Sequence, residues 1–122
     1  MLLWLDPNCP SILTNVVVSV EQHVGYISDI TGHLMSAGLD TIEATRTAEA
    51  DWAAHVAEVA GGTLFVYANS WYMGANIPGK PRVFLPYAGG FNVYRRKCGD
   101  VAARGYAGFR ISSSKEARSS VA

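Results

Sequence analysis

The stretch from Ala68 to Pro81 most limits what this chain can fold into. Its fourteen residues contain two glycines, two prolines and two asparagines, a composition that interrupts both helix and strand. A long irregular loop in a compact protein is usually functional or mobile. The loop also contains Trp71, which has no helical face to bury it, so a packing role and a binding role both remain open. Regular elements are expected only on either side of this loop.

The longest apolar periodicity in the chain predicts a helix over residues 19–37. Valine, isoleucine and leucine recur there at the intervals of one helix face. Ser19 with Gln22 three positions later has the form of a capping box, and Gly38 is the expected stop signal. The preceding valines, residues 16–18, are β-branched and are predicted to be extended.

Two further helices are predicted, one on each side of the loop. Thr47 is the expected N-cap of the first, which is acidic in its opening turn and ends at Gly61. Trp52 lies on its apolar face and is interpreted as a core residue. The other helix is predicted over residues 92–104 and stops at Gly105.

Short strands complete the predicted elements. Alternation over residues 39–45 is typical of a strand, residues 83–87 form a second candidate, and a last strand is expected around Phe109 and Ile111. The serine-rich and charged tail from Ser112 onward is predicted to be disordered. Taken by itself, the chain is expected to be mainly α-helical with short strands and long loops.

Charge divides the chain into two parts of opposite sign. Residues 21–58 contain seven acidic residues and one arginine, whereas residues 80–118 contain nine basic and two acidic residues. Two explanations remain open. The two parts pair with each other or with absent parts of a larger protein, or the basic part binds a phosphate-bearing partner. The basic run at residues 95–97 has no interleaved aromatic residues, so nucleic-acid binding is not expected.

Length and composition indicate one small folded domain, since the chain has 122 residues of which 49% are hydrophobic. Its start lacks a signal-peptide pattern, and no run reaches the ~20 apolar residues that a membrane helix needs. Cys9 and Cys98 have no metal-like spacing and suggest no disulfide framework. We therefore expect a cytoplasmic protein with no membrane partner.

Several site motifs fail when they are compared with the sequence in detail. Residues 74–80 have the glycine spacing of a phosphate-binding P-loop, but Pro81 stands where that loop needs serine or threonine to hold magnesium. The three histidines lack further ligands at a recognised spacing, which argues against a metal site. The chain contains no G-x-G-x-x-G sequence, so any flavin or nicotinamide nucleotide has to be bound mainly elsewhere.

The loop sequence carries a resemblance to a known family. From Ser70 to Pro81 it reads Ser-Trp-Tyr-Met-Gly-Ala-Asn-Ile-Pro-Gly-Lys-Pro, which resembles the mobile control loop of type I Baeyer-Villiger monooxygenases. Further short stretches resemble the family in the same order, namely residues 13–15, 19–24, 41–45, 62–65, 87–90 and 105–109. The similarity extends over roughly residues 10–111.

This resemblance implies a C-terminal fragment of a flavin-dependent monooxygenase. The parent enzyme is then an α/β protein with two dinucleotide-binding domains that uses NADPH to reduce FAD. It inserts one oxygen atom from O2 into a ketone to give an ester or lactone, and sulfides are a further substrate class. The missing N-terminal domains, as a separate chain, are the implied protein partner. The fragment alone is expected to be inactive.

The resemblance also assigns roles to individual residues, none of them catalytic. Trp71 matches a tryptophan that bonds to the nicotinamide cofactor when the loop closes. Asn76 and Lys80 belong to the same motif, with a loop-ordering or cofactor-neighbouring role. Positions before the first helix match the lining of the substrate pocket beside the flavin. The substrate-pocket residues are Ser11, Ile12, Leu13, Thr14 and Phe84, and the cofactor-binding residues beside them are Asn15 and Val16.

Departures from the family pattern set the expected boundaries. Residues 1–9 do not match the family and are predicted to be unrelated or wrongly started, residues 10–111 form the monooxygenase part, and residues 112–122 form the tail. Val16 stands where many relatives have methionine, which is expected to alter the pocket. The alternative hypothesis is an independent, non-catalytic module that binds a phosphate-bearing ligand or a protein partner.

Overall fold

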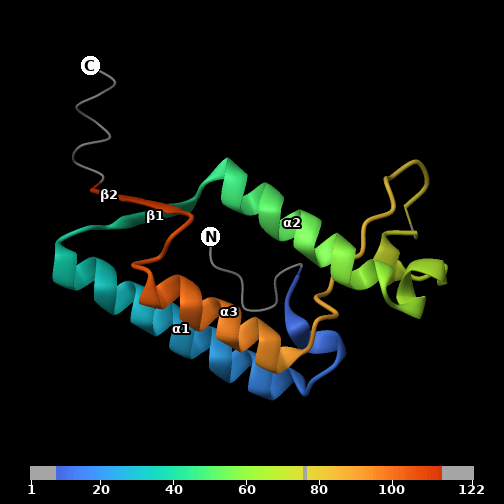
Figure 1. Cartoon of the computed structure of the whole chain (residues 1–122), viewed down its shortest axis with the longest axis horizontal. Helices are drawn as coiled ribbons and strands as arrows, with labels where there is room; N and C mark the ends of the chain where they lie inside the picture. Colours follow the sequence, from blue (N-terminus) through green and yellow to red (C-terminus); the bar gives the residue numbers. More distant parts are fainter. Residues whose placement is uncertain (1–7, 76, 114–122) are drawn as a thin grey trace.

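Three α-helices and a two-stranded sheet make up most of the part of the chain that the structure describes, residues 8–75 and 77–113 (Figure 1). The structure is a computed structural model. The helices and strands are α1 (Val16–Ala37), β1 (Thr41–Ala44), α2 (Arg46–Gly61), α3 (Phe91–Ala103) and β2 (Phe109–Ser112). Short 3-10 helices are η1 (Pro10–Ile12), η2 (Leu64–Tyr67) and η3 (Trp71–Met73). The chain is therefore mainly helical, as predicted.

Helix α1 begins earlier than predicted, because its cap is Asn15. The Asn15 Oδ1 accepts a hydrogen bond from the backbone N–H of Val17 at 2.9 Å, which satisfies a free amide of the first turn. The valines at residues 16–18 therefore form the first turn of the helix, and the prediction of an extended segment is wrong. The predicted capping box is also wrong, since Ser19 lies inside the helix and is buried. Gly38 ends the helix as predicted, in the left-handed conformation at φ 66°.

Helices α2 and α3 lie close to their predicted positions. The cap of α2 is Thr45, which has extended backbone and whose side-chain oxygen accepts a hydrogen bond from the N–H of Ala48 at 3.2 Å. The predicted cap at Thr47 is wrong, because that residue already lies within the first turn. The predicted ends are confirmed, since α2 runs to Gly61 and α3 ends just before Gly105.

Strands β1 and β2 form an antiparallel pair in which Thr41 lies opposite Ser112 and Ala44 lies opposite Phe109. The two strands predicted in these regions are confirmed. The predicted start of the disordered tail is wrong, because Ser112 belongs to β2, and residues 114–122 of that tail lie outside the described residues. The strand predicted over residues 83–87 is wrong. Backbone amides of this segment bond singly to two different parts of the chain, so no continuous ladder forms.

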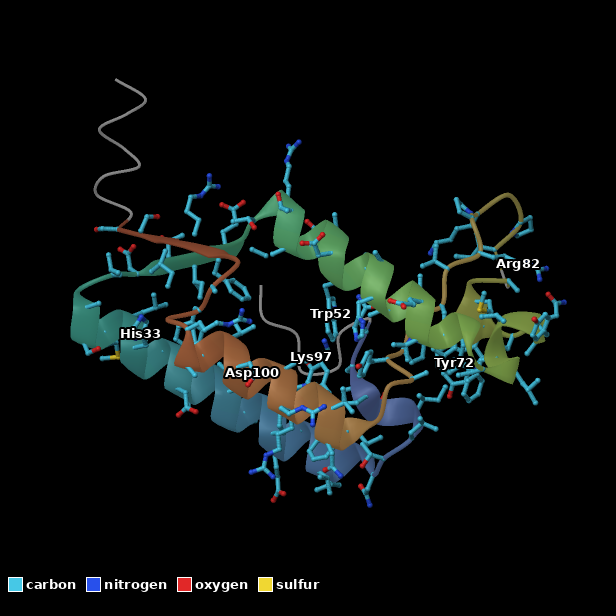
Figure 2. All side chains as sticks on the ribbon, viewed as in Figure 1. His33, Trp52, Tyr72, Arg82, Lys97 and Asp100 are labelled. Atoms are coloured by element: carbon cyan, nitrogen blue, oxygen red, sulfur yellow. The ribbon has the colours of Figure 1, made fainter. Side chains whose placement is uncertain are left out.

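Helices α1 and α3 lie side by side, whereas α2 runs apart from them (Figure 1). The β1–β2 pair connects these two layers at one end. Figure 2 shows Trp52 on the side of α2 that faces the α1 and α3 pair. The layers are therefore joined at their ends and through side chains such as Trp52.

Five rings, which we call the aromatic bridge, join α2 to α1 and α3: Trp52, His55, Tyr87, Tyr94 and His23. The Trp52 ring centroid lies 5.2 Å from that of Tyr87 and 6.0 Å from that of Tyr94. Each histidine is hydrogen-bonded to a tyrosine, with His55 Nε2 3.1 Å from the Tyr87 hydroxyl and His23 Nε2 3.2 Å from the Tyr94 hydroxyl. Trp52 is thus a packing residue, as predicted, and His23 and His55 belong to the same ring cluster.

A small apolar core lies where the end of α2 meets the loop region. Its buried members are Ala60, Met73, Phe84 and Ala88. Other large apolar side chains remain at the surface, namely Leu13, Val16, Val17, Met35, Leu64 and Tyr67. Among the described residues, no helix has the length and apolar character needed to cross a membrane.

Candidate functional site

The loop of residues 68–81 is irregular, as predicted, apart from the short helix η3. Gly74 follows η3 in the left-handed conformation at φ 66°, which a side chain adopts only with strain. Across the base of the loop, Arg82 Nη2 donates a hydrogen bond to Asn69 Oδ1 at 2.8 Å. The two ends of the loop are thereby held together.

Trp71 lies at the surface of this loop and is 62% exposed. Its ring stacks on that of Tyr72, with centroids 4.1 Å apart and planes inclined by 31°. The tyrosine orients the indole without covering it. This exposure argues against the packing role that the sequence left open, and the binding role stays a prediction.

The residues that follow Trp71 turn inwards and anchor the loop. Met73 is a buried member of the apolar core, and Tyr72 packs against that core. The Phe65 ring centroid lies 6.5 Å from that of Tyr72 and 5.5 Å from that of Phe84. The loop therefore has a fixed inner side, and Trp71 lies on its exposed side.

The predicted pocket segment before α1 lies beside the same core. Ser11 Oγ accepts a hydrogen bond from the Cys9 thiol at 3.1 Å. Ile12 packs against the core, whereas Leu13 is 55% exposed and Thr14 is half-buried. The segment thus has one side chain in the core and an apolar neighbour at the surface.

The remaining predicted site residues have different surroundings. Asn15 caps α1, the following Val16 is 47% exposed, and Lys80 is exposed near the end of the loop. Asn76 lies outside the described residues. Phe84 is 4% exposed and belongs to the core. Val16 and Lys80 are therefore accessible to a ligand, whereas Phe84 is enclosed.

The structure brings Ile12, Tyr72 and Phe84 into one cluster, so the pocket segment, the loop and the stretch after the loop meet there. Sequence reasoning missed the hydrogen-bonded pair of His55 and Tyr87, in which Tyr87 directly precedes the core residue Ala88. The Tyr-Ala-Gly-Gly stretch at residues 87–90 marked the position as part of the resemblance. It did not indicate that a histidine from α2 would bond to the tyrosine.

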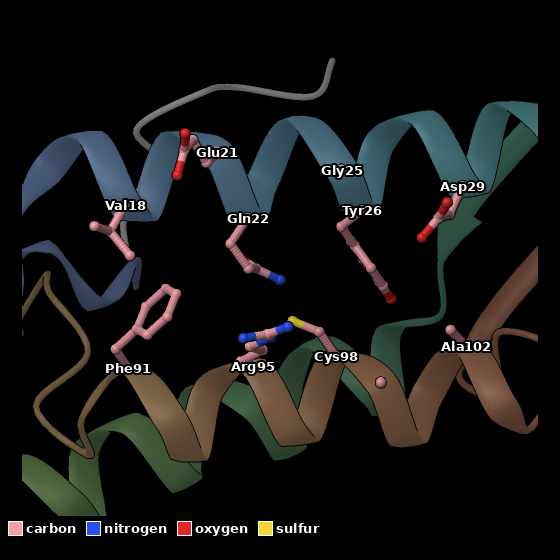
Figure 3. Close-up of a pocket in the computed structure, with 11 residues that line it drawn as sticks. Val18, Glu21, Gln22, Gly25, Tyr26, Asp29, Phe91, Arg95, Cys98 and Ala102 are labelled. Atoms are coloured by element: carbon pink, nitrogen blue, oxygen red, sulfur yellow. The ribbon is translucent and has the colours of Figure 1, made fainter.

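A groove of about 480 Å³ lies between α1 and α3 (Figure 3). None of the predicted site residues lines it. Burial raises the pKa of the Cys98 thiol, which lies in this groove, so the thiol stays protonated at neutral pH. Burial likewise raises the pKa of Tyr26 to about 12. The thiol and phenol of the groove are therefore both protonated at neutral pH.

Ligating side chains near the loop suit an anion better than a metal ion. In residues 8–75 and 77–113, no three His, Cys, Asp or Glu side chains are grouped so that they could hold a metal. Lys80 and Arg82, which are both exposed, instead place two cations at and just after the end of the loop. Cations of this kind bind phosphate and carboxylate groups.

Comparison with known proteins gives similarities along most of the chain. The chain is 42% identical over 113 residues to the acetone monooxygenase (methyl acetate-forming) of Gordonia sp. (strain TY-5), which covers 92% of this chain and 21% of that protein. It superposes on a crystal structure of cyclohexanone monooxygenase from Rhodococcus sp. Phi1 bound to NADP+ with a TM-score of 0.81. That match has 38% identity and covers 88% of this chain and 20% of the other. No protein-family model matches the chain.

A Baeyer-Villiger monooxygenase from Pseudooceanicola batsensis is 37% identical over 102 residues, covering 84% of this chain and 18% of that enzyme. The chain is homologous to one segment of the Baeyer-Villiger monooxygenases. The resemblance inferred from the loop is thereby confirmed. The chain spans only about a fifth of the length of the Baeyer-Villiger relatives that it matches.

Proposed function

We propose that this chain is the C-terminal part of an FAD- and NADPH-dependent Baeyer-Villiger monooxygenase, carrying its nicotinamide-facing loop and part of its ketone pocket. The parent enzyme inserts one oxygen atom from O2 into a ketone to give an ester or lactone. The observation that carries the proposal is the exposed Trp71, oriented by Tyr72 in the loop that resembles the family. The Rhodococcus relative is bound to NADP+, which supports a nicotinamide nucleotide as the ligand.

The accessible side chains of the loop fit a nicotinamide nucleotide. Trp71 has an indole N–H donor and a ring face on which a flat group can rest. Lys80 and Arg82 are exposed cations of the type that binds phosphate groups. Their proposed roles are binding and orientation, and none of them transfers a proton.

The exposed apolar residues before and at the start of α1 form the ketone-facing surface in this proposal. Leu13 and Val16 are 55% and 47% exposed. An apolar wall of this kind binds the carbon skeleton of a ketone and excludes water from it. Ser11 and Thr14 are their proposed neighbours in the pocket, while Phe84 supports the wall from inside the core.

In the parent, bound FAD that has been reduced by NADPH supplies the electrons for activating O2. This chain contributes residues that bind, orient and exclude water, and it lacks the glycine fingerprint for binding a dinucleotide by itself. We therefore expect the isolated chain, mixed with FAD, NADPH and acetone, to retain no flavin and to consume no NADPH. Ketone-dependent NADPH consumption by the isolated chain would refute this part of the proposal.

A chimera tests the role of Trp71. Residues 10–111 of this chain replace the matching segment of the Gordonia acetone monooxygenase, and Trp71→Phe is introduced into that chimera. The substitution removes the indole N–H. We expect the KM for NADPH to rise about tenfold, which corresponds to the free energy lost with one hydrogen bond. Steady-state kinetics at saturating acetone measure this change.

Met35→Leu in the same chimera is the control, because Met35 is a 76% exposed residue of α1 that lies outside the loop. We expect its KM for NADPH to equal that of the unsubstituted chimera. Equal KM values for Trp71→Phe and Met35→Leu would show that Trp71 has no part in binding the nucleotide.

A further inference from the structure

Residues 84–88 lie between the two parts of the proposed site. The backbone N–H of Leu85 donates a hydrogen bond to the carbonyl of Tyr72 at 2.9 Å, on the side of the loop. The N–H of Tyr87 donates to the carbonyl of Cys9 at 2.9 Å, on the side of the pocket segment. This short segment therefore connects the loop to the chain that leads into the pocket.

Tyr87 fixes the segment to α2. It is 0% exposed, and its hydroxyl lies 3.1 Å from His55 Nε2. Its ring also lies against Trp52, at a centroid distance of 5.2 Å. A buried hydroxyl needs a partner, because burial without one costs free energy. The bond to His55 therefore determines where the Tyr87 ring can sit relative to α2.

Gly89 leaves the space that this arrangement needs. A Cβ atom at position 89 would overlap the ring and hydroxyl of Tyr87. The tyrosine ring lies back over its own chain, so a larger residue at this position would displace it from His55. A glycine in the segment and a histidine on α2 thus hold one ring in one place.

We propose that Tyr87 is a positioning residue of the monooxygenase site. Through its bond to His55 it fixes residues 84–88, and so it sets where the loop with Trp71 lies relative to the pocket residues 11–14. The importance of this placement for catalysis rests on the proposed function. The placement itself can be measured without a cofactor, so the two proposals can fail separately.

The test measures the 19F resonance of Trp71 in the full chain labelled with 5-fluorotryptophan, assigned by its loss in Trp71→Phe. Tyr87→Phe removes the hydroxyl and keeps the ring. We expect it to shift or broaden the Trp71 resonance and to speed amide exchange at Leu85 about tenfold, as for one lost hydrogen bond. Tyr67→Phe removes the hydroxyl of an 83% exposed tyrosine and is expected to change neither signal.

Substitutions at His55 provide the second comparison. Glutamine keeps a polar partner for the Tyr87 hydroxyl, so His55→Gln should preserve the Trp71 resonance that His55→Phe alters. Wild-type signals in both Tyr87→Phe and His55→Phe would overturn the proposal. If Tyr87→Phe loses its helical circular dichroism, the comparison of His55→Gln with His55→Phe tests the proposal instead. Identical Trp71 resonances in these two variants would overturn the proposal.

Discussion

Asn15 serves the fold and, through it, the proposed site. Its Oδ1 accepts the hydrogen bond from the N–H of Val17 that starts α1. The start of the helix places Val16 at the surface directly after the pocket segment. Because the side-chain oxygen is already used as a cap, we infer that Asn15 affects a cofactor indirectly, through the position of its neighbours.

Replacing this cap should destabilise the chain. We expect Asn15→Ala to lower the free energy of unfolding by about 1 kcal/mol, because the first turn of α1 loses the side-chain acceptor for an amide. Asn15→Asp keeps an acceptor and should stay close to the wild type. Urea titration followed by circular dichroism measures both. A stability of Asn15→Ala equal to that of Asn15→Asp would rule out the capping role.

At the scale of elements, the β1–β2 pair links the acidic and basic parts of the chain. Arg110 Nη2 on β2 lies 2.5 Å from Glu43 Oε2 on β1. Both side chains are largely exposed, so this ion pair orients the strands more than it stabilises them. It provides a direct case of the pairing between the two parts that the charge pattern left open.

The pair predicts a pH dependence with a definite sign. The hydrogen bond and the charge of Arg110 hold the pKa of Glu43 below its ordinary value of 4.5. A lowered folded-state pKa means that the stabilisation is present above the unfolded-state pKa and is lost as the pH falls through the folded-state pKa. We expect Arg110→Gln to return the pKa of Glu43 to its ordinary value, as measured by 13C NMR titration of the carboxyl. An unchanged Glu43 titration in Arg110→Gln would contradict the pairing.

The sequence predicted most elements because their signals are local. Apolar spacing and stop glycines such as Gly38 identified the helices and their ends. The starts were missed because several side chains can cap, and only the fold decides whether Asn15 or Ser19 has extended backbone. Residues 83–87 were mistaken for a strand because their hydrogen-bond partners come from distant parts of the chain.

The candidate site was predictable to the extent that family resemblance reached it. The loop and its exposed Trp71 were identified from sequence, whereas the burial of Phe84 and the bond between His55 and Tyr87 were not. Such a contact joins residues far apart in the sequence, and neither composition nor periodicity reports it. Local sequence patterns identify the loop, but the contacts that hold it in place are visible only in the tertiary structure.

At the scale of the whole molecule, several large apolar side chains are exposed. Leu64 and Tyr67 are 85% and 83% exposed, and Val17 is 65% exposed. Leu64 and Tyr67 are three positions apart in the 3-10 helix η2 and therefore lie on one side of it. Apolar side chains that are exposed next to each other are typical of an interaction site. Because the chain matches about a fifth of its relatives, we propose that the remaining part of a monooxygenase covers these residues.

This surface should bind a hydrophobic dye. We expect the isolated chain to enhance the fluorescence of anilinonaphthalene sulfonate, and a double variant, Leu64→Ser with Tyr67→Ser, to bind less of it. The free energy of unfolding should change by less than about 0.5 kcal/mol, since both side chains are at the surface. Equal dye binding by the variant and the wild type would show that η2 is not part of the apolar surface.

The most direct test of the central claim is product formation by the chimera that carries residues 10–111 in the Gordonia acetone monooxygenase. Its matched control is the same enzyme lacking that segment. If this chain is the loop and pocket part of a Baeyer-Villiger monooxygenase, the chimera should convert acetone to methyl acetate with consumption of NADPH, and the control should not. A chimera that folds and retains FAD yet forms no methyl acetate would contradict the claim.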